Sequence, residues 1–105
     1  MPQALGAEGA ILGVVFGDPL RAPPVEGHAN KVLWLVNPSV ASTGPDASAS
    51  PALRIHATLN GGDLDVDREL PDGPGPSIID MPRAGCWTLH LSWSGHSDTL
   101  ALLYS

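Results

Sequence analysis

The fold is decided by residues 86–104, which have the sequence CWTLHLSWSGHSDTLALLY. Apolar side chains occupy every second position from Trp87 to Trp93 and polar ones fill the gaps, which is the two-residue period of a half-buried strand. A second alternating run follows, and the Gly95 between the two runs is typical of a tight hairpin turn. This stretch therefore predicts an antiparallel hairpin with one apolar face that another sheet must cover.

The register of this hairpin depends on which residues form its turn. A two-residue loop of Gly95 and His96, with Gly first as a type II′ turn prefers, places Trp93 opposite Asp98. The same register pairs Leu91 with Leu100, Leu89 with Leu102 and Trp87 with Tyr104. We expect the two tryptophans of this face to lie in the core, because large aromatic side chains normally form the packing centre of a small domain.

The rest of the chain contains further short runs with strand character, separated by turn residues. They cover residues 11–16, 31–36, 52–59, 64–70 and 77–81. Twelve Gly and eleven Pro interrupt the 105 residues so often that an ordinary α-helix has little room. The prediction is an all-β fold, an antiparallel immunoglobulin-like β-sandwich of about seven short strands.

The chain is long enough for one domain with its own core. Residues 10–105 are predicted to form this single β-sandwich domain. Residues 1–9 are small and nonperiodic, which predicts a flexible N-terminal segment. Residues 38–51 have almost nothing to bury, which predicts a mobile surface loop.

The charge balance argues against several classes of partner. Five basic and eleven acidic side chains give a formal net charge of −6, which opposes attraction to nucleic acid or to an anionic membrane surface. No segment approaches the roughly twenty apolar residues of a membrane span. We therefore expect no nucleic-acid partner and no membrane-spanning segment.

Residues 76–93 combine a proline, a turn, a Gly85-Cys86-Trp87 corner and the first strand of the final hairpin. This arrangement resembles the C-terminal signature of small uncharacterised secreted proteins and lipoproteins of actinobacteria. Residues 16–21 and 30–34 resemble earlier blocks of the same group. The resemblance implies an exported β-sandwich, extracellular or in the cell envelope, and supplies no catalytic residue. The chain departs from the group because it shows neither an export signal nor a lipid-attachment cysteine.

A metal site is one candidate, because thiolate and imidazole bind copper and zinc. Cys86 is the only cysteine and lies four residues before His90 on the same face of the predicted strand, so these two are the candidate metal ligands. A metal site that also used His56 would require the strand of His56 to lie next to the strand of Cys86 and His90. Asp63, Asp65 and Asp67 alternate as in a calcium loop, but the glycine and the bidentate glutamate of that motif are missing, which favours a solvated acidic edge.

Binding without catalysis is the leading prediction for function. Arg54, His56 and Thr58 alternate with apolar residues and should share a solvated face. Trp34 lies in a strand that is apolar on both sides, so it belongs either to the core or to the second face, and it is our candidate if one tryptophan is exposed for binding. Together with the loop at residues 40–50 they predict a noncatalytic binding or structural module that presents loops to a protein or glycan partner. The alternative is a metal-handling protein that uses Cys86 and His90.

A hydrolase is the third hypothesis. Its paired acids would come from Asp80, Asp98 or Glu26. Such a pair needs a defined separation in space, and spacing in the sequence does not give it. No serine lies in a Gly-x-Ser-x-Gly elbow, and no glycine-rich loop leads into a helix that could hold a phosphate. We therefore expect no cofactor and favour a protein without enzymatic activity.

Overall fold

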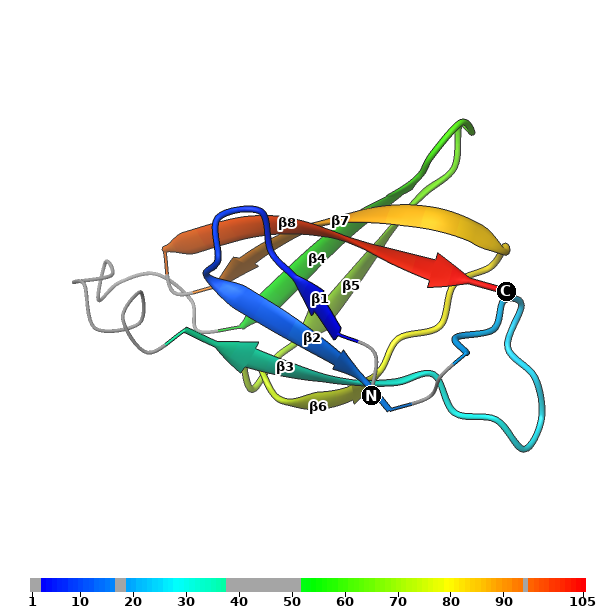
Figure 1. Ribbon diagram of the computed structural model, residues 1–105, viewed down its shortest axis with the longest axis horizontal. Helices are drawn as coiled ribbons and strands as arrows, with labels where there is room; N and C mark the ends of the chain where they lie inside the picture. Colours follow the sequence, from blue (N-terminus) through cyan, green and yellow to red (C-terminus); the bar gives the residue numbers. More distant parts are fainter. Residues whose placement is uncertain (1–2, 17–18, 38–51, 94) are drawn as a thin grey trace.

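The structure is a computed structural model that describes residues 3–16, 19–37, 52–93 and 95–105. Two antiparallel four-stranded sheets pack face to face as a β-sandwich (Figure 1), which confirms the predicted all-β fold. Sheet A has the strand order β1-β2-β3-β6 and sheet B the order β5-β4-β7-β8. The strands are β1 Gln3–Leu5, β2 Ile11–Val15, β3 Lys31–Val36, β4 Leu53–Leu59, β5 Asp65–Leu70, β6 Pro76–Ile78, β7 Gly85–Trp93 and β8 His96–Tyr104. Within the described ranges, no helix has the length and apolar character needed to cross a membrane.

The described residues form eight strands, where the sequence predicted about seven. The additional strand is β1, which lies inside the segment 1–9 that was expected to be a loose end. β1 pairs with β2, with Gln3 opposite Val14 and Leu5 opposite Leu12. Three residues are too few to show a period, so the sequence pattern could not reveal this strand. The predicted surface loop and its candidate binding part, residues 40–50, lie outside the described residues.

The C-terminal hairpin forms as predicted, but its register differs by two residues. Trp93 lies opposite His96 and Leu91 opposite Asp98, so Gly95 with its φ of 79° is the last residue of the loop instead of the first. A shift by two residues preserves the side of the sheet to which each side chain points. The apolar face therefore points inward as expected, and both Trp87 and Trp93 are buried.

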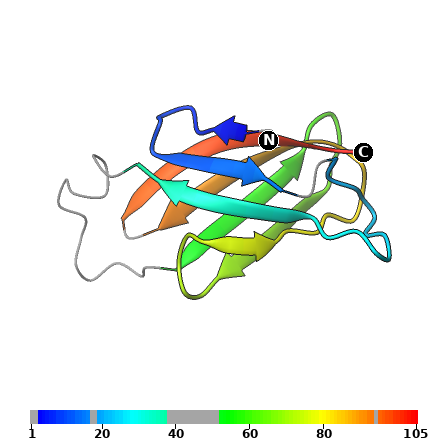
Figure 2. The ribbon, with the colours of Figure 1, turned by 60° about the horizontal axis from the view of Figure 1, so that its bottom comes forward.

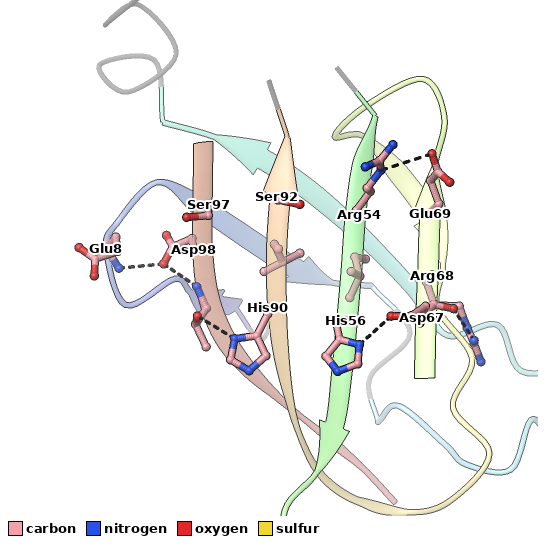
Figure 3. Close-up of a pocket in the computed structure, with 13 residues that line it drawn as sticks. Glu8, Arg54, His56, Asp67, Arg68, Glu69, His90, Ser92, Ser97 and Asp98 are labelled. Carbon is pink, nitrogen blue, oxygen red and sulfur yellow. Dashed lines mark hydrogen bonds and ion pairs between the residues drawn. The ribbon is translucent and has the colours of Figure 1, made fainter. Parts of the chain in front are cut away.

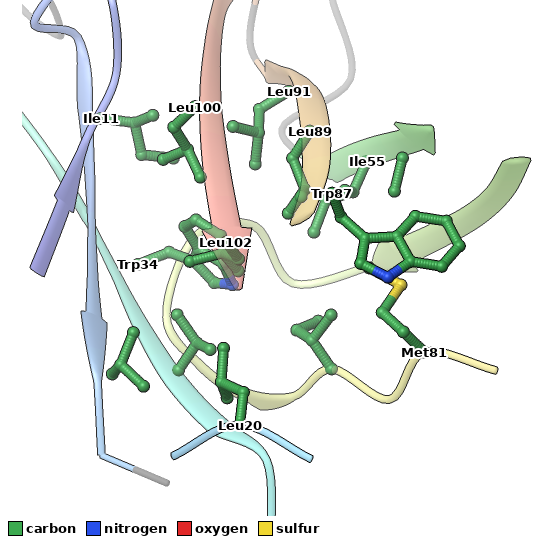
Figure 4. Close-up of a cluster of buried hydrophobic side chains, with 14 of the residues drawn as sticks. Ile11, Leu20, Trp34, Ile55, Met81, Trp87, Leu89, Leu91, Leu100 and Leu102 are labelled. Atoms are coloured by element: carbon green, nitrogen blue, oxygen red, sulfur yellow. The ribbon is translucent and has the colours of Figure 1, made fainter. Parts of the chain in front are cut away.

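The core lies between the two sheets (Figure 4), and both sheets contribute tryptophans to it. Trp34 on β3 is only 1% exposed, and its indole N–H donates a hydrogen bond to Ser77 Oγ at 3.1 Å. The prediction that Trp34 lies exposed and contacts a partner is therefore wrong. Sheet B covers the inner side of β3, and Gly13 on the neighbouring strand leaves room for the ring: a Cβ at this position would lie 2.9 Å from a Trp34 ring carbon.

Candidate functional site

A groove of about 720 Å³ lies on the outer face of sheet B (Figure 3). Alternation along the strands puts its side chains there. In β4 the buried residues Leu53, Ile55 and Ala57 point into the core, so the intervening Arg54 and His56 point to solvent. The same alternation in β7 turns His90 and Ser92 outward, onto the floor of the groove.

One rung of the sheet crosses the groove through all four strands. His56 is paired with Asp67 on one side and with His90 on the other, and His90 is paired with Thr99. His56 Nδ1 lies 2.6 Å from Asp67 Oδ1, and His90 Nδ1 lies 3.4 Å from Thr99 Oγ1. The two imidazole rings are stacked, with centroids 6.4 Å apart and planes 28° apart. Four polar side chains from residues far apart in sequence thus form one continuous row.

The β5 side of this row controls the charge of His56. The hydrogen bond to Asp67 raises the pKa of His56 above its ordinary value of 6.5, partial desolvation opposes this, and the charges of Asp67 and Asp65 add to the increase. Asp65 Oδ2 lies 3.6 Å from His56 Nε2. An imidazole held between two carboxylates is stabilised in its protonated form.

The neighbouring rung carries a second cation. Arg54 Nε lies 3.9 Å from Glu69 Oε1, and both side chains are more than half exposed. Such an exposed, long ion pair contributes at most about 1 kcal/mol to stability, so both the Arg54 guanidinium and the Glu69 carboxylate remain available to a ligand. Ser92 and Ser97 continue this rung across β7 and β8.

Asp98 is a buried carboxylate at the end of the groove near Glu8. Its oxygens accept hydrogen bonds from the backbone N–H groups of Glu8 and Ala10 at 2.8 Å, Ile11 at 3.3 Å and its neighbour Thr99 at 2.7 Å. Burial raises the pKa of Asp98, but these four hydrogen bonds outweigh burial, and the pKa lies below its ordinary value of 3.8. This carboxylate fastens the β1–β2 connection of sheet A to β8 of sheet B.

The other acids proposed for hydrolysis do not join Asp98. Asp80 Oδ1 accepts a hydrogen bond from the buried Asn30 side chain at 2.9 Å, and Glu26 lies exposed in the connection before β3. Neither Asp80 nor Glu26 lines the groove. Among the described residues, the hydrogen bonds of Asp98 and Asp80 go to backbone groups and to Asn30, and not to a second acid.

The predicted metal ligands are not brought to one place. Cys86 and His90 lie four residues apart along an extended strand, which corresponds to about 13 Å. The nearest polar partner of the Cys86 sulfur is Asn60 Nδ2 at 3.5 Å. The strand of His56 is a neighbour of β7, as such a site would need, but His56 lies opposite His90 and not opposite Cys86. In the ranges that the structure describes, no three His, Cys, Asp or Glu side chains are grouped to hold a metal ion.

The sequence identified part of this site. The sequence pattern predicted that Arg54, His56 and the β5 aspartates lie on solvated faces, because the alternation of polar and apolar residues determines the direction of each side chain. It did not place His90 beside His56, since β4 and β7 are not consecutive and 33 residues intervene between the two histidines. It also missed Glu8, whose place at the margin of the groove depends on the hydrogen bonds to Asp98.

The chain was compared with known protein families, curated proteins and solved structures. No family model, no curated protein and no solved structure matches the chain.

Proposed function

We propose that this chain is a noncatalytic binding module of a bacterial cell envelope, and that the groove on sheet B takes an extended, basic segment of a protein partner. The observation that carries the proposal is the distribution of charge in the groove. Glu8 lies at one margin, Asp67 and Glu69 lie at the other, and hydroxyl and imidazole groups lie between them (Figure 3). Of the two arginines in the lining, Arg54 is in a long ion pair with Glu69, and the guanidinium of Arg68 donates to the backbone carbonyl of Asp80. Lysine or arginine side chains that reach to either margin from an extended peptide would each meet a carboxylate.

The lining of the groove favours a protein over a glycan. Carbohydrate sites use exposed aromatic rings that stack on sugar faces. None of the described groove residues is Trp, Tyr or Phe, and the three tryptophans are at most 4% exposed. The polar floor instead offers hydrogen-bonding groups at the spacing of neighbouring strands, which suits a peptide backbone.

The resemblance of residues 76–93 to secreted and lipoprotein sequences of actinobacteria supports the envelope location. The net charge of −6 also favours a basic protein partner and opposes a polyanionic one. Detection of the native protein in the envelope fraction, and not in the cytosolic fraction, is the measurement that checks this location.

The binding proposal is tested by NMR titration of the 15N-labelled protein with an alternating Lys-Ser octapeptide, and separately with an N-acetylglucosamine tetramer. We expect the peptide to shift the amide signals of His56, His90 and Thr99, and the sugar to leave them in place. Asp67→Asn combined with Glu69→Gln should weaken peptide binding by about ten-fold, because two carboxylates at one margin are lost.

The matched control is Glu26→Gln combined with Asp72→Asn, which removes the same charge from exposed positions outside the groove. It should weaken binding by less than about two-fold at physiological ionic strength, because distant charges are screened. Equal weakening by both double variants would show nonspecific attraction and overturn the proposal, as would the absence of shifts with the peptide. Shifts at the groove with the sugar alone would favour a glycan partner instead.

A further inference from the structure

Two histidines lie side by side on the floor of the groove. His56 and His90 are directly opposite each other on the neighbouring strands β4 and β7, and the centroids of their stacked rings are 6.4 Å apart. Residues directly opposite each other in an antiparallel pair have Cβ atoms only about 5 Å apart. Because neutral imidazole is the commonest metal ligand in proteins, two imidazoles at this spacing are candidate donors to one divalent cation.

The hydrogen bonds of the two rings determine which nitrogens can bind a cation. His56 Nδ1 lies 2.6 Å from Asp67 Oδ1, and His90 Nδ1 lies 3.4 Å from Thr99 Oγ1, on opposite sides of the pair (Figure 3). An imidazole whose Nδ1–H donates to an outer oxygen carries its lone pair on Nε2. Metal-binding histidines are oriented in the same way by an acceptor at their second nitrogen. The outer partners therefore leave Nε2 of both rings as the donor atoms.

Asp65 adds a carboxylate beside one of these donor atoms. Its Oδ2 lies 3.6 Å from His56 Nε2. Around a tetrahedral zinc ion with bonds of about 2.0–2.1 Å, neighbouring nitrogen and oxygen donors are about 3.3 Å apart. The carboxylate and the first imidazole are thus already near the separation that a shared ion requires. Beyond them on the same face lies Thr58, which is opposite Asp65 and Thr88, so no bulky side chain follows His56 there.

The second imidazole must move to complete the site. As the described residues stand, no three His, Cys, Asp or Glu side chains are close enough to hold one ion. Two imidazoles on one tetrahedral zinc have centroids about 5 Å apart, so the rings of His56 and His90 must approach each other by about 1 Å. Both residues are exposed, so a small side-chain rotation disturbs no packed core.

The charges near His56 favour a cation. Asp65 and Asp67 both bring carboxylate oxygens to its ring. Of the arginines that line the groove, Arg54 precedes His56 by two residues and lies away from Asp65. Arg68 alternates with the two aspartates along β5, and its guanidinium donates to backbone carbonyls. A divalent ion beside Asp65 would therefore meet two negative charges and no neighbouring guanidinium.

We propose that His56, His90 and Asp65 bind one zinc ion, with water at the fourth position. Imidazole favours zinc and other transition metals, whereas calcium and magnesium prefer oxygen ligands alone. Cys86 takes no part, because it lies four residues from His90 along an extended strand. The proposal does not rest on peptide binding, since it assigns a different ligand to the groove.

The proposal is tested by calorimetric titration of the full chain with zinc chloride at pH 7.5, together with NMR of the imidazole signals. We expect one ion per chain with a dissociation constant on the order of 10 μM, because one ligand must be repositioned. Zinc should shift the signals of His56 and His90 and leave those of His28 in place. His90→Gln and Asp65→Asn should each weaken binding at least about ten-fold, because each removes one ligand.

Cys86→Ser and Asp63→Asn are the matched controls. The first removes the thiol, and the second removes an exposed carboxylate just before β5. Each should change the dissociation constant by less than about two-fold. Loss of binding in Cys86→Ser would assign the ion to the thiolate and overturn the proposal. So would the absence of binding at about 1 mM zinc, or equal weakening by Asp63→Asn and Asp65→Asn in variants that keep the circular dichroism spectrum of the unmodified chain.

Discussion

Asp98 shows what a single residue contributes, because it joins segments about ninety positions apart. Its carboxylate accepts four backbone N–H groups, and Gly6 lies so close that a Cβ there would overlap a carboxylate oxygen. In Asp98→Asn, an amide NH₂ would replace one acceptor and face donors. We expect the free energy of unfolding at pH 7 to fall by about 2–3 kcal/mol, measured by urea denaturation, because buried N–H groups would lose charged acceptors.

The pH dependence of this loss identifies its cause. The pKa of Asp98 in the folded chain lies below 3.8. The ionised carboxylate therefore stabilises the folded chain fully above the unfolded pKa, and this stabilisation is lost as the pH falls through the folded pKa. The stability difference between the unmodified chain and Asp98→Asn should therefore shrink in acid. An equal difference at pH 7 and at pH 2 would contradict the assignment, and Asp72→Asn at an exposed position should show almost no difference at pH 7.

His56 is the second residue with a defined electrostatic environment. It faces Asp67 and Asp65 on β5 and the imidazole of His90 on β7. Asp67→Asn should lower the pKa of His56, because it removes the largest cause of the increase. NMR titration of the imidazole signals measures this, and Asp63→Asn is the control, since Asp63 is not among the causes of the shift.

The sign of the corresponding stability effect follows from linkage. The pKa of His56 in the folded chain lies above 6.5. The contribution of the protonated imidazole to the free energy of unfolding is therefore complete below the unfolded pKa, and it disappears as the pH rises through the folded pKa. An unchanged His56 pKa in Asp67→Asn would show that the hydrogen bond at 2.6 Å does not hold the imidazolium in solution.

At the scale of elements, β2 shows how packing overrides strand propensity. Glycine is unfavourable within a strand and valine is favourable, yet Gly13 faces the Trp34 ring across the pair of strands. Gly13→Val should therefore lower the free energy of unfolding by about 1–3 kcal/mol, because the larger side chain cannot fit without displacing the indole. Thermal or urea denaturation measures the change.

Gly75→Ala provides the control for this substitution. Gly75 has no atom within 4 Å of an added Cβ and no positive φ, so its replacement should leave stability within about 0.5 kcal/mol or raise it slightly. A Gly13→Val variant as stable as the unmodified chain would mean that the core around Trp34 has room that the structure does not show.

Strand positions and side-chain direction could be predicted well at this scale, whereas register could not. The period of two in residues 86–104 fixed which side chains of β7 and β8 are buried, whatever the turn. The turn residues left two registers that differ by two positions and bury the same side chains, so the hydrophobic pattern could not distinguish them. The observed register brings Asp98 opposite Leu91, where it meets the N–H groups of residues 8–11.

At the scale of the whole molecule, the two outer faces of the sandwich have opposite chemistry. Sheet B presents the charged groove, and sheet A presents exposed apolar side chains, among them Leu5, Leu35 and Ile78. The two faces lie on opposite sides of the core (Figures 1 and 2).

Composition and local periodicity by themselves determined the all-β class, most of the strands and the inward direction of Trp87 and Trp93, because these depend on neighbouring residues and on the cost of exposing apolar surface. Only the tertiary structure decided that β1 forms, that Trp34 is covered, and that His56 lies beside His90. Each of these depends on a pairing between distant segments, and the free energy of such a pairing comes from contacts that no local pattern contains.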